Sequence, residues 1–135
     1  MMEKIEWSGE VFALILRAGY EPDGVDFITS PANPLQLGVI KHQRGSRIEP
    51  HIHKSSPRTI NEVQEVLHIE YGKVEAEFYQ TGGKKVGGAI LNAGDTILLI
   101  SGGHGFNILE DAKIMEIKQG PYHGVEEDKQ HLQTS

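Results

Sequence analysis

Apolar residues along this chain occur in short runs that alternate with polar residues, and turn-forming residues separate the runs. No segment keeps the helical period of about 3.6 residues for long. The alternation instead predicts β-strands, because successive side chains on a strand point to opposite faces. The predicted strands are 11–17, 25–29, 35–42, a run that begins at Glu65, 74–79, 86–91, 96–100, 106–109 and 112–119. This many short strands indicates an all-β sandwich or barrel.

Proline and glycine mark the connections between these runs. Residues 30–34 contain two prolines, which would remove two hydrogen-bond donors from a sheet. We expect 71–73 to be a tight connection between two strands, and 42–46 to turn into a strand that carries His51 and His53. Each of these expectations concerns a boundary between neighbouring strands.

His51 and His53 are the first candidate functional residues. They are two positions apart, so on a strand both imidazoles would point to the same face. In the run that follows, Glu65 shares a face with Leu67 and Ile69. Two such strands side by side would aim two imidazoles and a carboxylate into one interior, a set that suits a divalent metal such as Fe, Mn, Ni, Zn or Cu. The alternative is that the pair arises from composition alone, in a chain with seven histidines.

Two segments of the chain resemble the motifs of the cupin superfamily. The first motif, G-x5-H-x-H-x3,4-E-x6-G, fits Gly45, both histidines, Glu65 and Gly72, but eleven residues separate His53 from the glutamate. The second, G-x5-P-x-G-x2-H-x3-N, is matched more loosely: Gly94 and Gly102 fit, Ile100 stands where proline is usual, His104 comes one residue early and Asn107 is off the spacing. The resemblance covers residues 45–108.

The resemblance implies a single-domain, all-β fold of the cupin type, a double-stranded β-helix or jelly-roll barrel. The barrel would span 1–125, with N-terminal strands in 5–42 and the motif core in 45–108, followed by a polar tail at 126–135. It also implies one divalent metal ion in the barrel. The implied ligands are His51, His53, Glu65 and His104, with Glu62 a weaker candidate for the glutamate position. The alternative is a polar network without metal, as in cupins that bind sugars.

Three further residues are candidates for substrate contacts. Phe106 lies two positions after His104 and would wall the same interior, together with Ile117. Gln119 is the polar residue on the face predicted to point inward at the end of the chain's last strand, and a buried amide needs partners. Arg58 lies in the eleven-residue insertion, where a loop at the barrel rim could bind a carboxylate or phosphate. The alternatives are ordinary core packing for Phe106 and Gln119, and a solvated surface side chain for Arg58.

Composition narrows the classes of partner. The chain has 135 residues, enough for one domain with its own core, and its lack of cysteine excludes disulfides and thiolate metal sites. A formal charge of −6 argues against general nucleic-acid binding. No apolar run reaches the length of a membrane span, and we expect a cytoplasmic protein. The apolar segment 5–16, with Trp7 and Phe12, predicts a homodimer.

Two functions therefore remain open from the sequence. The first is a small cupin metalloenzyme, a dioxygenase or an isomerase, acting on a small polar or anionic substrate. The second is a non-catalytic module that binds a metal, a sugar or another small ligand. The fold implied by the resemblance hosts both classes and does not choose between them.

Overall fold

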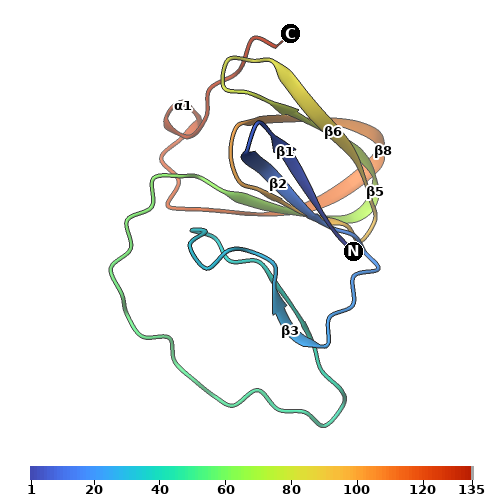
Figure 1. The fold of residues 1–135 in the computed structure, drawn as a ribbon, viewed down its shortest axis with the longest axis vertical. Helices are drawn as coiled ribbons and strands as arrows, with labels where there is room; N and C mark the ends of the chain where they lie inside the picture. The colour runs from blue at the N-terminus through green and yellow to red at the C-terminus, as the bar shows by residue number, and fades with distance from the viewer. Residues whose placement is uncertain (135) are drawn as a thin grey trace. The chain divides into compact units, whose positions relative to one another are not determined.

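The computed structural model describes residues 1–134 and contains eight strands and one short helix in these residues (Figure 1). The elements are β1 Met2–Trp7, β2 Glu10–Leu16, β3 Gly24–Phe27, β4 Gly38–Lys41, β5 Glu65–Tyr79, β6 Lys85–Asn92, β7 Thr96–Leu99, β8 Gly103–Lys118 and α1 Val125–Asp128. The chain divides into two compact units, and each is described here by itself. Unit 1 comprises Met1–Tyr20 and the residues from Val63 onward, and unit 2 comprises Glu21–Glu62.

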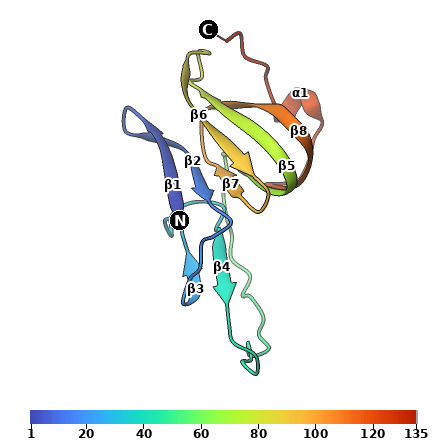
Figure 2. The same ribbon diagram turned by 90° about the vertical axis from the view of Figure 1, so that its right-hand side faces the viewer.

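Unit 1 is a six-stranded antiparallel sheet that curls into a half-barrel (Figure 2). The strand order is β1-β2-β7-β5-β6, and β8 pairs with β5 along almost its whole length. The first half of β5 also pairs with β7, and its second half with β6. The strand β5 is therefore the element that orders the whole sheet.

The bend in β5 depends on Gly72. This residue has a φ of 96°, and a Cβ there would collide with the backbone of Asp111 and Ala112 on β8. Only glycine accepts both constraints without strain. The register against β8 shifts on either side of Tyr71, as expected where bulges bend a strand. The sequence-based prediction of a tight connection at 71–73 is therefore wrong: the glycine bends one continuous strand instead of separating two.

The core lies on the concave face of this sheet. Alternate residues of β5 point into it, because the side-chain period of a strand is two. Full burial of each large aliphatic or aromatic side chain contributes roughly 1.5–3 kcal/mol to folding. The buried core residues are Phe12, Ala13, Ile15, Leu67, Ile69, Val74, Ala76, Phe78, Leu91, Ile97 and Leu99.

The structure of β8 differs from a second sequence-based prediction. Residues 106–109 and 112–119, expected to be two strands, form one strand that ends at Lys118. Its cross-strand partners place Ile114 opposite Ile69 and Glu116 opposite Leu67, so these residues face the core. Ile117 lies on the opposite face and is 57% exposed. The prediction that Ile117 points inward is therefore wrong.

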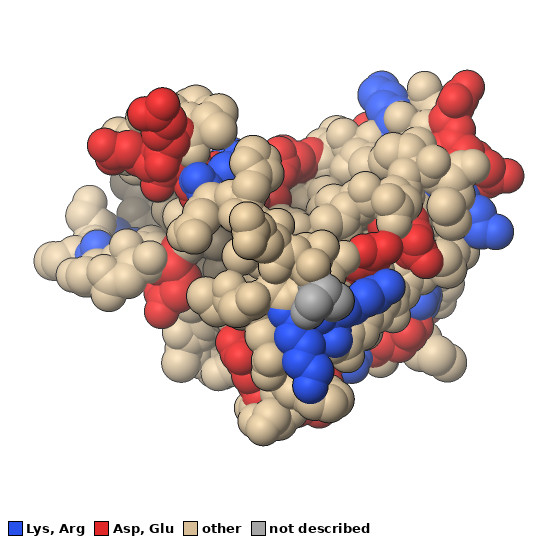
Figure 3. All heavy atoms as spheres, turned by 90° about the horizontal axis from the view of Figure 1, so that it is seen from above, with Lys and Arg blue, Asp and Glu red and all other residues tan. Residues whose placement is uncertain are grey.

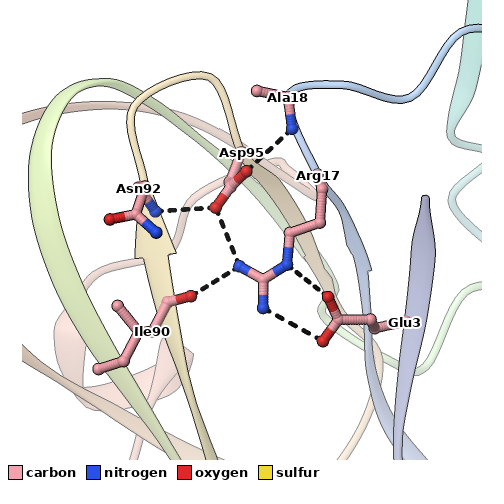
Figure 4. A network of polar contacts seen from close by, with 6 residues as sticks. All are labelled: Glu3, Arg17, Ala18, Ile90, Asn92 and Asp95. Carbon is pink, nitrogen blue, oxygen red and sulfur yellow. Dashed lines mark hydrogen bonds and ion pairs between the residues drawn. The ribbon is translucent and has the colours of Figure 1, made fainter.

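A polar network joins the N-terminal hairpin to the turn before β7 (Figure 4). The Arg17 guanidinium donates from Nη1 to Asp95 Oδ2 at 2.9 Å and to the Ile90 carbonyl at 2.6 Å, and from Nε to Glu3 at 2.5 Å. The Asp95 carboxylate also accepts the backbone N–H groups of Ala18 at 2.9 Å and Asn92 at 2.8 Å. These bonds fix β2 against the β6–β7 turn.

Unit 2 contains the antiparallel pair β3–β4 and a long irregular segment. Residues 42–64 form no strand, so the predicted strand carrying His51 and His53 does not form. The physical reason lies in the sequence: Pro50 and Pro57 cannot donate to a ladder. Within the described part of the chain, no helix is long and apolar enough to cross a membrane.

Candidate functional site

A pocket of about 830 Å³ opens on the concave face of unit 1. Its floor comes from β5 and β8, and a C-terminal wall comes from residues after β8. The strands contribute Glu65, Leu67, Tyr79, His104, Phe106, Ile114, Glu116 and Lys118, and the C-terminal wall includes Asp128, Lys129, His131 and Leu132. A volume of this size suits a small molecule. On the face drawn in Figure 3, acidic and basic side chains lie interspersed and form no single charged patch.

The pairing of β5 with β8 explains why these side chains meet. Glu65 lies opposite Lys118, and Phe78 lies opposite His104. Because Phe78 is a core residue, its partner His104 points to the same concave face. The two ends of the paired strands β5 and β8 thus bring a carboxylate, an ammonium and an imidazole to one pocket.

The carboxyl groups of Glu65 and Glu116 both line the pocket and interact with each other. Burial, the hydrogen bond to Glu116 and the charge of Glu116 together raise the pKa of Glu65 to about 7, and the charges of Lys118 and Lys129 oppose this rise. Two carboxylates this close cannot both ionise without cost. Near neutral pH the pair therefore holds a proton, which a cation could replace.

His104 lies beside Phe106, with 5.7 Å between the ring centroids. Desolvation lowers the pKa of His104, and the positive charge of Lys129 acts in the same direction, while Glu116 opposes it. The imidazole is therefore neutral at physiological pH. A neutral imidazole has a free lone pair, which can ligate a metal or accept a proton.

The remaining predicted metal ligands lie in unit 2. His51 and His53 are exposed, with 5.2 Å between their ring centroids, and Nδ1 of His51 lies 2.8 Å from the Glu49 carbonyl. Glu62 is also exposed. Of the four predicted ligands, the structure brings Glu65 and His104 to one pocket and places the two histidines of the pair in the other unit. Residues 1–134 contain no group of three or more His, Cys, Asp or Glu side chains arranged to hold a metal ion.

The three predicted substrate-contact residues do not all lie in the pocket. Phe106 lines the pocket, as expected. The side-chain amide of Gln119 donates to the Gly120 carbonyl at 3.0 Å, and this residue is not part of the pocket lining. Arg58 is exposed in the irregular segment of unit 2.

Sequence reasoning missed Glu116, Lys118 and Tyr79. The signal for the first two was present in residues 113–118, where charged residues are interspersed with apolar ones. Both faces of that run carry apolar side chains, so the pattern alone did not identify the inward face. The pairing with Leu67 and Glu65 identifies it.

Comparison with known protein families, curated proteins and solved structures found no match to this chain. The fold defines the chain as an all-β protein with a curled antiparallel sheet and a polar pocket on its concave face.

Proposed function

We propose that this protein binds a divalent metal ion in the pocket of unit 1 and acts there on a small polar or anionic molecule, as a dioxygenase or an isomerase of the cupin type. The observation that carries the proposal is that Glu65 and His104, from the two motif-like segments, line the same pocket. A carboxylate and a neutral imidazole are ligands that Fe, Mn, Ni, Zn and Cu accept.

The donor chemistry of the pocket fits such an ion. Metal binding requires a deprotonated carboxylate and a neutral imidazole, and it releases any proton that they hold. The lowered pKa of His104 supplies the neutral imidazole. The proton held between Glu65 and Glu116 would leave as the cation arrives. Glu65 and His104 would hold the metal, which would supply Lewis-acid or redox chemistry to the substrate.

His51 and His53, the other two ligands implied by the cupin resemblance, are exposed in a segment of unit 2 without regular structure. Two protein ligands in the pocket would leave coordination positions open to a substrate, as a catalytic metal site requires.

Elemental analysis of protein purified without an affinity tag tests the proposal. We expect close to one transition-metal ion per chain in the wild type and loss of the metal in Glu65→Gln and in His104→Ala. The matched control is His42→Ala with His123→Ala, which removes two histidines that are exposed and outside the proposed set. A metal-free wild type, or retention of the metal in the Glu65 variant, would overturn the proposal.

The second candidate is a non-catalytic module that binds a small ligand. It is favoured by the mixed lining of the pocket, where Phe106, Ile114 and Leu67 lie beside the charged groups and can pack against a ligand without any metal. Steady turnover that is lost on chelation would support the enzyme. Ligand binding without turnover would support the module.

Homodimer formation through 5–16 stays a prediction, and light scattering tests it. The structure provides another explanation for the apolar character of this segment. Phe12, Ala13 and Ile15 are buried in the core of unit 1, whereas Trp7 is 42% exposed. A dimer contact would therefore rely on β1.

A further inference from the structure

The C-terminal wall of the pocket comes from residues 128–134, which belong to the segment 120–134, here called the C-terminal strap. Its regular part is α1, a single helical turn with no buried residue. Two hydrogen bonds close this turn, from Asp128 N–H to the Gly124 carbonyl and from Lys129 N–H to the Val125 carbonyl, both at 3.0 Å. A helical turn this short has little stability of its own, so its contacts with the sheet hold it in place.

An ion pair joins the strap to the sheet. Lys118 Nζ lies 3.1 Å from Asp128 Oδ2, and both side chains are mostly buried, with 24% and 12% of their surface exposed. The same ammonium lies 5.0 Å from the centroid of the Tyr122 ring. Farther along, Leu132 lies so close to Gly103 that a Cβ at the glycine would collide with it. The strap is therefore held by one charge contact and a few apolar contacts.

Lys118 belongs to the pocket as well as to this ion pair. It lies opposite Glu65 in the β5–β8 pairing and lines the pocket. Its ammonium is thus positioned to meet the negative group of a small molecule. The group that now satisfies it, a carboxylate, has the same chemistry as the anionic end of such a ligand.

We propose that the pocket binds a small oxyanion, a carboxylate or a phosphate, which replaces Asp128 as the partner of Lys118 and thereby releases the C-terminal strap. Lys118 is then the residue that selects for anionic ligands. In the ligand-free protein, the carboxylate of Asp128 occupies the place of the ligand's anionic group. The inference rests on the pocket assigned under the proposed function, but it does not require the metal.

Replacing the Asp128 carboxylate by a bound oxyanion changes the interaction energy at Lys118 little, because one oxyanion takes the place of another. The buried ammonium is never left unpaired. The cost is the loss of the strap contacts. A ligand that binds only the released state raises the population of that state in proportion to its concentration above its Kd. Ligand binding and release of the strap are therefore the same equilibrium.

Amide hydrogen exchange on the full chain in EDTA tests the inference, with potassium phosphate and potassium acetate as probes. The reporters are the amides of Asp128 and Lys129, which close α1, and the amide of Val74 in the core is the internal reference. At ten times the Kd, we expect at least one probe to speed exchange of the α1 amides by about tenfold and to leave Val74 unchanged. Potassium chloride at the same ionic strength corrects for screening of the ion pair.

Two pairs of variants make the test specific. Lys118→Met should abolish the response to the anions, whereas Lys113→Met, on the outer face of the same strand and paired with Glu70, should respond as the wild type does. Asp128→Asn should bind the anion more tightly than the wild type, and Glu127→Gln, an exposed neighbour, should not. Circular dichroism of each variant checks that it is folded.

The outcomes separate this inference from the proposed function. No response to either anion beyond that of potassium chloride in both the wild type and Asp128→Asn would overturn the inference. So would an undiminished response in Lys118→Met. Because EDTA is present throughout, a failure of the metal proposal leaves the expected anion response unchanged, and a failure here leaves the metal analysis unaffected.

Discussion

Unit 1 contains two clusters of partly or fully buried charge, and their partners differ. In the first, Asp95 is 4% exposed and accepts hydrogen bonds from the Ala18 amide, the Asn92 amide and the Arg17 guanidinium (Figure 4). In the second, the half-buried Glu65 meets another carboxyl group, that of Glu116. The carboxylate of Asp95 is surrounded by hydrogen-bond donors, whereas the carboxyl group of Glu65 lies beside a second carboxyl group that competes for the same proton.

This difference separates a structural cluster from a ligand site. The donors to Asp95 are backbone groups and an arginine held by several contacts, so this cluster is complete without any ligand. Glu65 and Glu116 compete for one proton beside Lys118 and His104, in a pocket open to small molecules. A carboxyl group with a raised pKa in an open pocket marks a candidate site for a metal or a substrate.

The largest expected effect comes from breaking the complete cluster. Asp95→Ala removes three hydrogen bonds, leaves two backbone amides without their acceptor and removes the buried carboxylate that pairs with Arg17. We expect a loss of about 3–5 kcal/mol in the free energy of unfolding, measured by urea denaturation. Glu3→Gln is the control, because Glu3 is 40% exposed on its side chain and its ion pair should contribute at most about 1 kcal/mol. Equal losses in the two variants would contradict the distinction.

A smaller effect, with a pH signature, is expected at the pocket. The pKa of Glu65 is raised to about 7 in the folded protein from an ordinary value of 4.5, so the folded state binds more protons between these values. Stability should therefore fall as the pH rises from about 4.5 to about 7, by about 1–2 kcal/mol after allowance for solvent screening of a half-exposed group.

Urea denaturation between pH 4 and pH 8 measures this dependence. Glu65→Gln should abolish the fall, and Glu116→Gln should reduce it, because burial remains but the neighbouring charge is removed. Glu6→Gln, at an exposed position on β1, should keep the wild-type dependence. The same dependence in Glu65→Gln as in the wild type would place the proton elsewhere in the protein.

The sequence predicted those parts of the fold that depend on local alternation. The runs at 11–17, 86–91 and 96–100 form β2, β6 and β7 with ends displaced by one residue or less. The period of two also placed Glu65 on the face of Leu67, and His104 on the face of Phe106, and all four line the pocket. This part of the site was predictable because each assignment lies within one strand.

The rest depended on information that one strand does not carry. Gly72 suggested a turn because glycine is common in turns. In the structure, its positive φ instead bends one continuous strand that has pairing partners on both sides. The inward face of β8 was misjudged because its register against β5 shifts three times before Ile69 meets Ile114. The segment carrying His51 and His53 was assigned to a strand by its spacing, although a strand also needs a partner ladder, and none forms there.

The smallest expected effect concerns His104. Its folded pKa is lowered, so its stabilising contribution is complete above the unfolded value of about 6.5 and is lost as the pH falls through the folded pKa. Because the ring is open to the pocket, the contribution should stay below about 1 kcal/mol, and NMR titration of the ring proton is the better measurement. Glu116→Gln should lower the pKa of His104 further, and Lys129→Met should raise it, since these charges act in opposite directions on the imidazolium. If neither variant moves the titration, His104 does not share the electrostatic environment of the carboxyl pair, and the pocket would contain two independent polar groups instead of one site.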